Sequence, residues 1–198
     1  MRLKETIKFY LLNTCTLIAV VAMTLYFFSQ VSDYAFGISS SNHPIIINLA
    51  LSLDQPFRFF GLTLLASSLV HESSTHLLTN CLLLFWLGAI LHTKFSNTRI
   101  LVLYCILALV NNLAVVVASH ALNQSGFVLG ASACLISLST LAILLQISGS
   151  KGLIIPLLLV VWLQPESASS LTTAGHLSGT LTGIIAYLLL KKRMMLLG

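Results

Sequence analysis

Charged residues are scarce in this chain: only 8% of its 198 residues are Asp, Glu, Lys or Arg, whereas 57% are hydrophobic. A water-soluble domain of this length cannot bury so large an apolar share in one core. The net charge of +5 does not indicate nucleic acid as a partner, because the basic residues are scattered at the ends of apolar runs. The composition therefore predicts a membrane protein surrounded by the lipid bilayer.

Paired cysteines and clustered metal ligands are missing as well. The four cysteines all lie inside apolar stretches, at Cys15, Cys81, Cys105 and Cys134. Their spacing matches neither a disulfide framework nor a zinc site, so we interpret them as small core residues. We expect no metal and no cofactor.

Long apolar runs dominate the rest of the chain. Six of them are candidates to cross a hydrocarbon core about 30 Å thick. They cover roughly 9–31, 74–92, 99–119, 132–147, 152–163 and 174–190. The first lacks a small-residue cleavage site, so it predicts a retained helix instead of a signal peptide. We predict an all-α membrane protein of six transmembrane helices, with residues 1–198 in a single domain.

The distribution of basic residues predicts the orientation. If the N-terminus is cytoplasmic, nine of the ten basic residues fall on the cytoplasmic side and only Arg58 falls on the other. The nine are Arg2, Lys4, Lys8, Lys94, Arg99, Lys151, Lys191, Lys192 and Arg193. The positive-inside rule favours this partition, so both termini are predicted to be cytoplasmic.

The segment 32–73 between the first two runs is predicted to be a long interfacial loop. It contains Pro44, Pro56 and an aromatic run around Arg58. The segment is too long for a simple turn and too interrupted to cross the membrane. Aromatic residues beside an arginine suit the headgroup region, so we expect this loop to rest in the outer interface.

Polar side chains inside the apolar runs indicate function, because each is costly in lipid. His76 and Asn80 are four residues apart in the second run and share a helix face. Ser132 opens the fourth run, and His176 opens the sixth. At a helical rise of 1.5 Å per residue, Asn80 lies roughly 21 Å, His176 roughly 22 Å and Ser132 roughly 24 Å from the cytoplasmic end of its own run. We therefore expect these residues to meet inside the membrane.

A serine becomes an effective nucleophile when a histidine takes its proton. Ser132 and His176 are the candidates for this pair, and no carboxylate lies within any run to complete a triad. His76, Asn80 and the backbone amide of Ser132 are candidates to donate hydrogen bonds to a tetrahedral oxyanion.

Small residues predict a close approach of the fourth and sixth runs. Gly175, Gly179 and Gly183 form two overlapping GxxxG patterns, which let a second helix backbone come near. Gly130 and Ala131 are small on the opposing side. A hydrogen bond between the two runs thus becomes sterically possible.

Together these motifs resemble the rhomboid family of intramembrane serine proteases. The family pattern is His, four residues, His, three residues and Asn in one span, Gly-x-Ser opening a later span, and Gly-His in the last. The matching residues are His71, His76, Asn80, Gly130, Ser132, Gly175 and His176. The resemblance runs from about Gln55 to Tyr187, and Gln55-Pro56-Phe57-Arg58 is similar to the family's Trp-Arg loop motif with Phe in place of Trp.

The resemblance implies a function for each matching residue. Ser132 would be the nucleophile and His176 the base, with His76 and Asn80 stabilising the oxyanion. His71 and Gly130 would support the site. The implied partners are transmembrane protein substrates, cleaved within or near the membrane.

The short six-span form is similar to small bacterial rhomboids, including the rhombosortase subgroup. It implies a multi-pass protein of the bacterial inner membrane, with the active site facing the periplasm. One residue departs from the family pattern: Ala133 follows Ser132 where the family usually has glycine. An inactive rhomboid-like protein that binds transmembrane helices is therefore the alternative.

Two other classes fit the sequence less well. His71-Glu72 followed by His76 is superficially similar to the zinc motif H-E-x-x-H, but histidines five apart do not share a helix face. A transporter would show paired intramembrane charges and a two-fold repeat, which are missing here. Asn111 and Asn112 in the third run are expected to bond to neighbouring helices.

Overall fold

Long helices make up most of the computed structural model, which describes residues 13–36, 43–147 and 169–197 together with Ser150, Gly152, Ile155, Leu158 and Leu159. The long helices within these residues are α2 (Thr14–Phe36), α5 (Ser74–Leu91), α6 (Asn97–Leu122), α7 (Ser132–Leu144) and α9 (Ser170–Leu197). All except α7 are long and apolar enough to cross a membrane. The span predicted at 152–163 lies for the most part outside the described residues. The chain is thus a multi-pass, mainly α-helical membrane protein.

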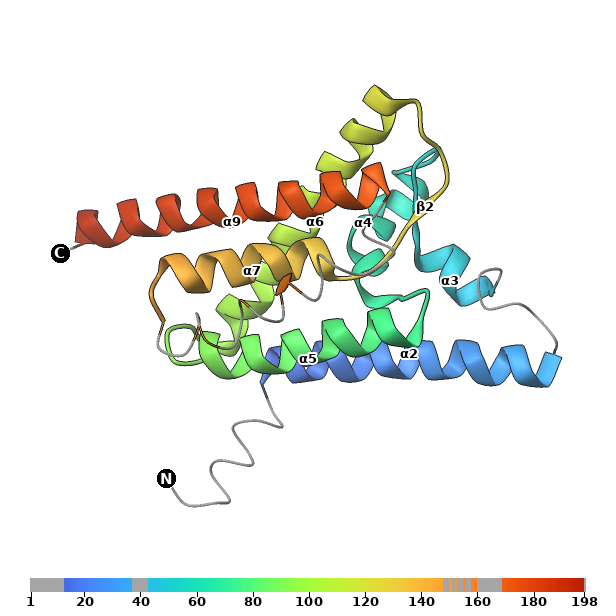
Figure 1. The fold of residues 1–198 in the computed structure, drawn as a ribbon, viewed down its shortest axis with the longest axis horizontal. Coiled ribbons are helices and arrows are strands. Elements are labelled where there is room, and N and C mark those ends of the chain that lie inside the picture. Colours follow the sequence, from blue (N-terminus) through green and yellow to red (C-terminus); the bar gives the residue numbers. More distant parts are fainter. Residues whose placement is uncertain are drawn as a thin grey trace, which may run out of the picture.

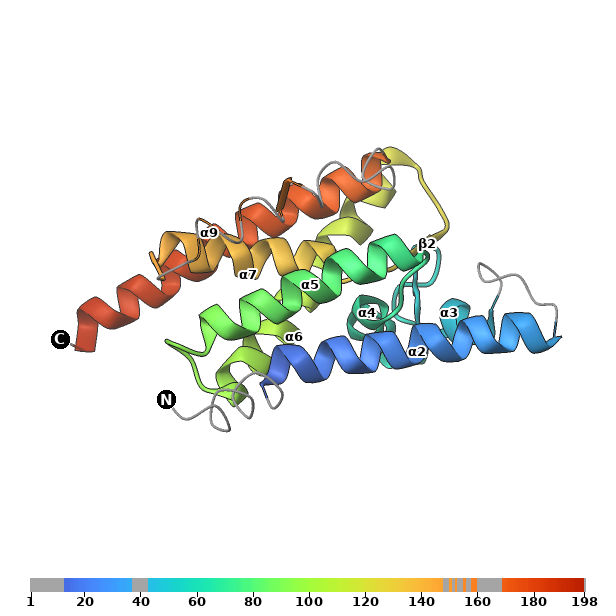
Figure 2. The ribbon, with the colours of Figure 1, turned by 60° about the horizontal axis from the view of Figure 1, so that its bottom comes forward.

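The helices pack in two side-by-side pairs joined by a third element. α2 lies along α5, and α7 lies along α9, while α6 crosses obliquely and contacts both α7 and α9 (Figure 1, Figure 2). α5, α7 and α9 run in one direction, and α2 and α6 run in the other (Figure 1). The N-terminal ends of α5, α7 and α9, which carry the polar residues singled out above, therefore face the same end of the molecule.

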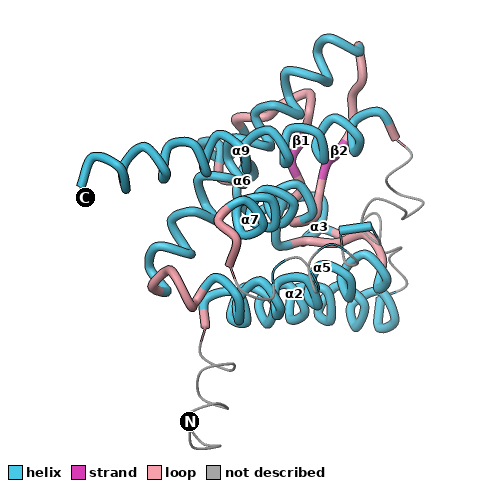
Figure 3. Tube along the Cα trace, turned by 60° about the vertical axis from the view of Figure 1, so that its left-hand side comes forward, coloured by secondary structure: helices cyan, strands magenta, loops and turns pink. Residues whose placement is uncertain are grey.

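α7 is the central helix of the bundle. It contacts α5, α6 and α9, and Figure 3 shows it between the α2–α5 pair and the α6–α9 side. Its leucines Leu135, Leu138 and Leu141 are fully buried. With 13 residues, α7 is about 20 Å long at the helical rise of 1.5 Å. That length is about 10 Å short of the hydrocarbon core, so the helix can begin well inside the membrane.

The helix starts differ in how their first amides are satisfied. α5 is capped by Ser73, whose Oγ accepts a hydrogen bond from the His76 amide at 3.2 Å. α6 is capped in the same way by Ser96. α7 begins after Ala131, which offers no side-chain cap. The N-terminal amides of α7 therefore remain accessible to another acceptor.

The segment from residue 43 to residue 69 covers the end of the bundle where α7 begins. It forms α3 (Pro44–Leu49), β1 (Leu51–Ser52), η2 (Arg58–Gly61), α4 (Thr63–Ala66) and η3 (Ser67–Leu69). β1 pairs antiparallel with β2 (Phe127–Val128), with Leu51 opposite Val128. This short pair joins the segment to the chain that leads into α7.

Arg58 links the parts of this segment. Its guanidinium donates to the carbonyl oxygens of Ile47 and Ala50, the latter at 2.5 Å, at the end of α3. It also lies 5.6 Å from the centroid of the Phe59 ring and 5.4 Å from that of the Phe127 ring. The Arg58 motif seen in the sequence thus ties α3 to β2.

The expected interfacial loop has an exposed part and a buried part. Phe57, Phe59 and Phe60 are exposed, as an interfacial segment requires. α4 and η3 instead pack against α6, and Leu64 and Ser67 are buried there. Asn112 of α6 donates from Nδ2 to the Leu64 carbonyl at 2.6 Å and to Ser67 Oγ at 3.0 Å. These hydrogen bonds satisfy backbone and hydroxyl groups that a loop segment would otherwise leave open to water.

Candidate active site

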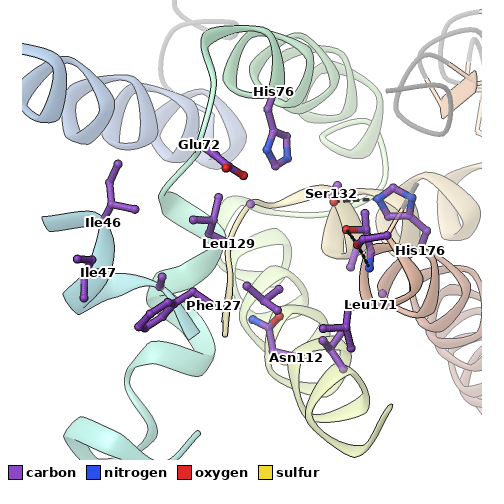
Figure 4. A pocket seen from close by; sticks show the side chains of 18 residues that line it. Ile46, Ile47, Glu72, His76, Asn112, Phe127, Leu129, Ser132, Leu171 and His176 are labelled. Carbon is purple, nitrogen blue, oxygen red and sulfur yellow. Dashed lines mark hydrogen bonds between the residues drawn. The ribbon is translucent and has the colours of Figure 1, made fainter. Parts of the chain in front are cut away.

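Ser132 and His176 form a hydrogen-bonded pair. Ser132 is the first residue of α7, and His176 lies in the second turn of α9. His176 Nε2 lies 3.1 Å from Ser132 Oγ, and the two side chains face each other in Figure 4. His176 is only 2% exposed, whereas Ser132 is partly exposed to the neighbouring cavity. The geometry allows a neutral imidazole to take the hydroxyl proton.

Two glycines of α9 set the distance between these helices. A Cβ added at Gly179 would lie 2.5 Å from the Ala133 carbonyl oxygen, and one at Gly183 would lie 2.6 Å from the Ser137 carbonyl oxygen. Both distances are too short for a side chain, so α9 can approach α7 this closely only with glycine at these positions. Of the three glycines predicted to pack there, Gly175 differs, because a Cβ at that position would make a contact of 3.4 Å with Val115 Cγ2.

A buried polar cluster fixes α6, α7 and α9 below the pair. Asn111 Nδ2 donates to Ser137 Oγ at 2.8 Å, and Ser137 Oγ lies 2.8 Å from Thr182 Oγ1. Asn111 Oδ1 accepts from Ser178 at 2.9 Å and from Thr182 at 3.0 Å. Each helix thus contributes at least one partner, and such networks are specific in apolar surroundings.

A cavity of about 520 Å³ opens beside Ser132. His76 and the Ser132–His176 pair contribute polar groups to its wall, and Figure 4 shows all three side chains around the same space. Apolar side chains from four elements also line the cavity, among them Ile46, Ile47, Val115, Phe127 and Leu171. Glu72 is the single acidic residue among the described lining residues. The cavity can therefore hold an apolar segment beside Ser132.

Gly130 makes room for His76. Its φ of +104° favours glycine, and a Cβ at this position would lie 2.5 Å from His76 Cε1. The Gly130 amide donates to the Ser67 carbonyl at 2.8 Å, which fixes the chain entering α7. A side chain at position 130 would therefore displace the His76 ring.

His71 and Asn80 lie together outside the cavity. Asn80 Nδ2 is 2.9 Å from His71 Nε2, and both residues are almost completely buried. Burial, with a further contribution from nearby His76, lowers the pKa of His71 to about 3, so its ring is neutral at physiological pH. Neither residue lines the cavity. Of the expected oxyanion stabilisers, His76 therefore faces the cavity and Asn80 faces His71.

The structure brings Ser132 and His176 within hydrogen-bonding distance, as their similar predicted depth led us to expect, whereas several hydrogen bonds around them were not predicted. The Ser137–Thr182–Ser178 cluster around Asn111 was not predicted, although small polar residues at helical spacing beside a GxxxG pattern were a signal for it. No signal indicated that His71 contacts Asn80. Among the described residues, no group of three or more His, Cys, Asp or Glu side chains could hold a metal ion.

The fold defines a helical membrane protein in which a serine and a histidine from two helices form a hydrogen bond at the wall of a cavity. The model of the rhomboid domain family matches residues 55–193 of the chain. This chain therefore belongs to the rhomboid family. No match was found among curated proteins.

Proposed function

We propose that this protein is an intramembrane serine endopeptidase that uses a Ser132–His176 dyad. The observation that carries the proposal is the 3.1 Å hydrogen bond between these side chains at the wall of a largely apolar cavity. Glu72 is the only acidic side chain on the described wall, and it lies near His76 instead of His176 (Figure 4). A dyad without an orienting carboxylate is therefore part of this proposal.

The reaction follows from the placement of these groups. His176 Nε2 takes the proton of Ser132 as Oγ attacks the scissile carbonyl, and then gives that proton to the departing amine. The oxyanion is stabilised by His76 and the uncapped Ser132 amide, which face the cavity. Asn80 contributes only when its amide turns from His71 toward the cavity. A water molecule, activated by His176, then hydrolyses the acyl-enzyme and restores Ser132.

The substrates that we propose are transmembrane protein segments. A helix hides its carbonyls in internal hydrogen bonds, so a segment must unwind locally before Ser132 can attack. We expect a model substrate with Gly, Ala or Ser near the outer interface to be cleaved in proteoliposomes, and replacement of these residues by Leu to slow cleavage. A rate that does not respond to these replacements would show that the site acts on loops already unwound.

We further propose six spans with both termini in the cytoplasm of a bacterial cell and the site open to the periplasmic side. The distribution of basic residues supports this orientation. A reporter fused after Lys94 should be active in the cytoplasm, and one fused after Gln124 should be active outside. These residues lie at opposite ends of α6, so a cytoplasmic Gln124 would contradict the model.

The alternative is an inactive rhomboid-like protein, for which Ala133 is the argument. The structure offers the methyl group space: a Cβ added at Gly175 would still lie 3.9 Å from Ala133 Cβ. The Ser132–His176 hydrogen bond is present with alanine in place. These two observations favour the active enzyme, and a rhombosortase-like specificity is a further possibility within it.

The substitution Ala133→Gly separates the two functions. For an active enzyme we expect cleavage to stay within a few-fold of the wild-type rate and stability to fall by up to about 1 kcal/mol, since glycine is less favourable in a helix. Cleavage rates and thermal unfolding of the two proteins measure both effects, with Ser132→Ala as the control in each background. An inert wild type that becomes active as Ala133→Gly would instead show an inactive protein.

A further inference from the structure

Glu72 lines the cavity but takes no part in the reaction described above. Among the described lining residues it is the only Asp, Glu, Lys or Arg. Its side chain is exposed, and Figure 4 shows it beside His76 and away from His176. A negative charge on an otherwise largely apolar wall is favourable only when water or a cation accompanies it. The function of Glu72 is therefore to be sought in what its carboxylate binds.

The start of α5 does not explain Glu72. The helix is capped by the next residue, Ser73, whose Oγ accepts a hydrogen bond from the His76 amide at 3.2 Å. A carboxylate before a helix that is already capped adds only a small stabilisation when it is exposed to solvent. The local fold thus leaves the Glu72 carboxylate available to a ligand.

The chain itself offers no cation to Glu72 on this side of the membrane. Arg58 is the only basic residue that the predicted topology places there. Its guanidinium donates to the carbonyl oxygens of Ile47 and Ala50 and lies 5.4 Å from the centroid of the Phe127 ring. Within the described part of the chain, no ion pair joins Glu72 to another residue. A cation that binds Glu72 must therefore come with the substrate.

The wall around Glu72 fits a long basic side chain. Ile46, Ile47 and Phe127 line the same cavity and supply apolar surface. Lysine and arginine pack their methylene stems against such a surface while the charged head reaches a polar group. An arginine head can also donate two hydrogen bonds to one carboxylate.

We propose that Glu72 is a specificity-determining residue, which selects transmembrane substrates that carry Lys or Arg close to the scissile bond. This inference rests on the proposed protease function. Basic residues are scarce on the outer flank of transmembrane segments, so a requirement for one separates substrates from most other membrane proteins. Glu72 binds a side chain and transfers no proton, so its charge determines which segment is cut and not how the peptide bond is broken.

The test is a charge exchange between enzyme and substrate. A model transmembrane substrate with Gly and Ala near the outer interface receives a single Lys, Gln or Glu at successive positions on either side of the scissile bond. In proteoliposomes we expect kcat/KM at one of these positions to be about 5- to 10-fold higher with Lys than with Gln, and lowest with Glu. The ratio of Lys to Gln cleavage should fall to about one in Glu72→Gln, and Glu72→Lys should favour the Glu substrate.

A matched control removes another carboxylate from the same predicted side of the membrane. Asp54 is exposed and does not line the cavity, so Asp54→Asn should keep the wild-type ratio of Lys to Gln cleavage. The inference is overturned by equal cleavage of the three substrates at every position, or by a Lys preference that survives Glu72→Gln or disappears in Asp54→Asn. A uniform loss for all substrates in Glu72→Gln would also overturn it, since that result would indicate a structural function at the start of α5. Cleavage that survives Ser132→Ala would instead overturn the proposed function, so the two failures are distinguishable.

Discussion

Ser132→Ala is expected to abolish cleavage of a membrane-embedded substrate, and His176→Ala is expected to do the same. Nucleophile and base act as one unit, and loss of either member of such a pair lowers kcat by about 10⁴-fold or more. The hydroxyl that lies against His176 Nε2 is that of Ser132, so Ser132→Ala removes the group that attacks the substrate. The measurement is the rate of product formation in proteoliposomes, with the double variant expected to be no worse than either single one.

The matched control is another buried serine of α7. Ser139 is fully buried, and its hydroxyl makes no hydrogen bond. Ser139→Ala should therefore preserve the cleavage rate and leave thermal stability equal or slightly higher. A similar loss of activity in Ser139→Ala and Ser132→Ala would mean that packing of α7, and not the hydroxyl of Ser132, explains the effect.

Gly179→Ala and Gly183→Ala are expected to have the next largest effects, on both activity and stability. The added methyl groups would meet the carbonyl oxygens of Ala133 and Ser137 at 2.5 and 2.6 Å, so α9 must move away from α7. Overpacking of this kind costs about 1–3 kcal/mol. A shift of about 1 Å between the helices would stretch the Ser132–His176 hydrogen bond and can lower kcat about 100-fold.

Gly175→Ala provides the comparison. A Cβ at Gly175 would lie 3.4 Å from Val115 Cγ2, which is an ordinary contact that a side-chain adjustment can relieve. We expect its effects on cleavage rate and on the thermal unfolding midpoint to be much smaller than those of Gly179→Ala. Equal effects at all three glycines would show that helix propensity, and not the approach of α9 to α7, determines the result.

The two residues of the proposed dyad could be found in the sequence because polar residues are rare in apolar runs. Ser132 and His176 stood out, and their similar depth placed them together without knowledge of the side-chain geometry. The structure brings them within hydrogen-bonding distance. The position of Asn111 and Asn112 inside an apolar run also predicted that they bond to neighbouring helices, and both do.

The contacts that surround the serine–histidine pair could not be predicted from the sequence in the same way. Spacing places Asn80 on the face of His76, but the path of the chain before α5 brings His71 to Asn80, and no periodicity encodes that path. The burial of α4 and η3 was also missed, because their hydroxyl-rich sequence resembles an exposed loop until Asn112 supplies the partners. Long-range hydrogen bonds decide both features.

Covalent labelling with a serine-directed fluorophosphonate tests the central claim, that His176 activates Ser132, most directly. The reagent needs an activated hydroxyl and no knowledge of the natural substrate. We predict one adduct on the folded protein, located at Ser132 by peptide mass spectrometry, absent in Ser132→Ala and strongly reduced in His176→Ala. Equal labelling of Ser132→Ala, or undiminished labelling of Ser132 when His176 is replaced, would contradict the claim.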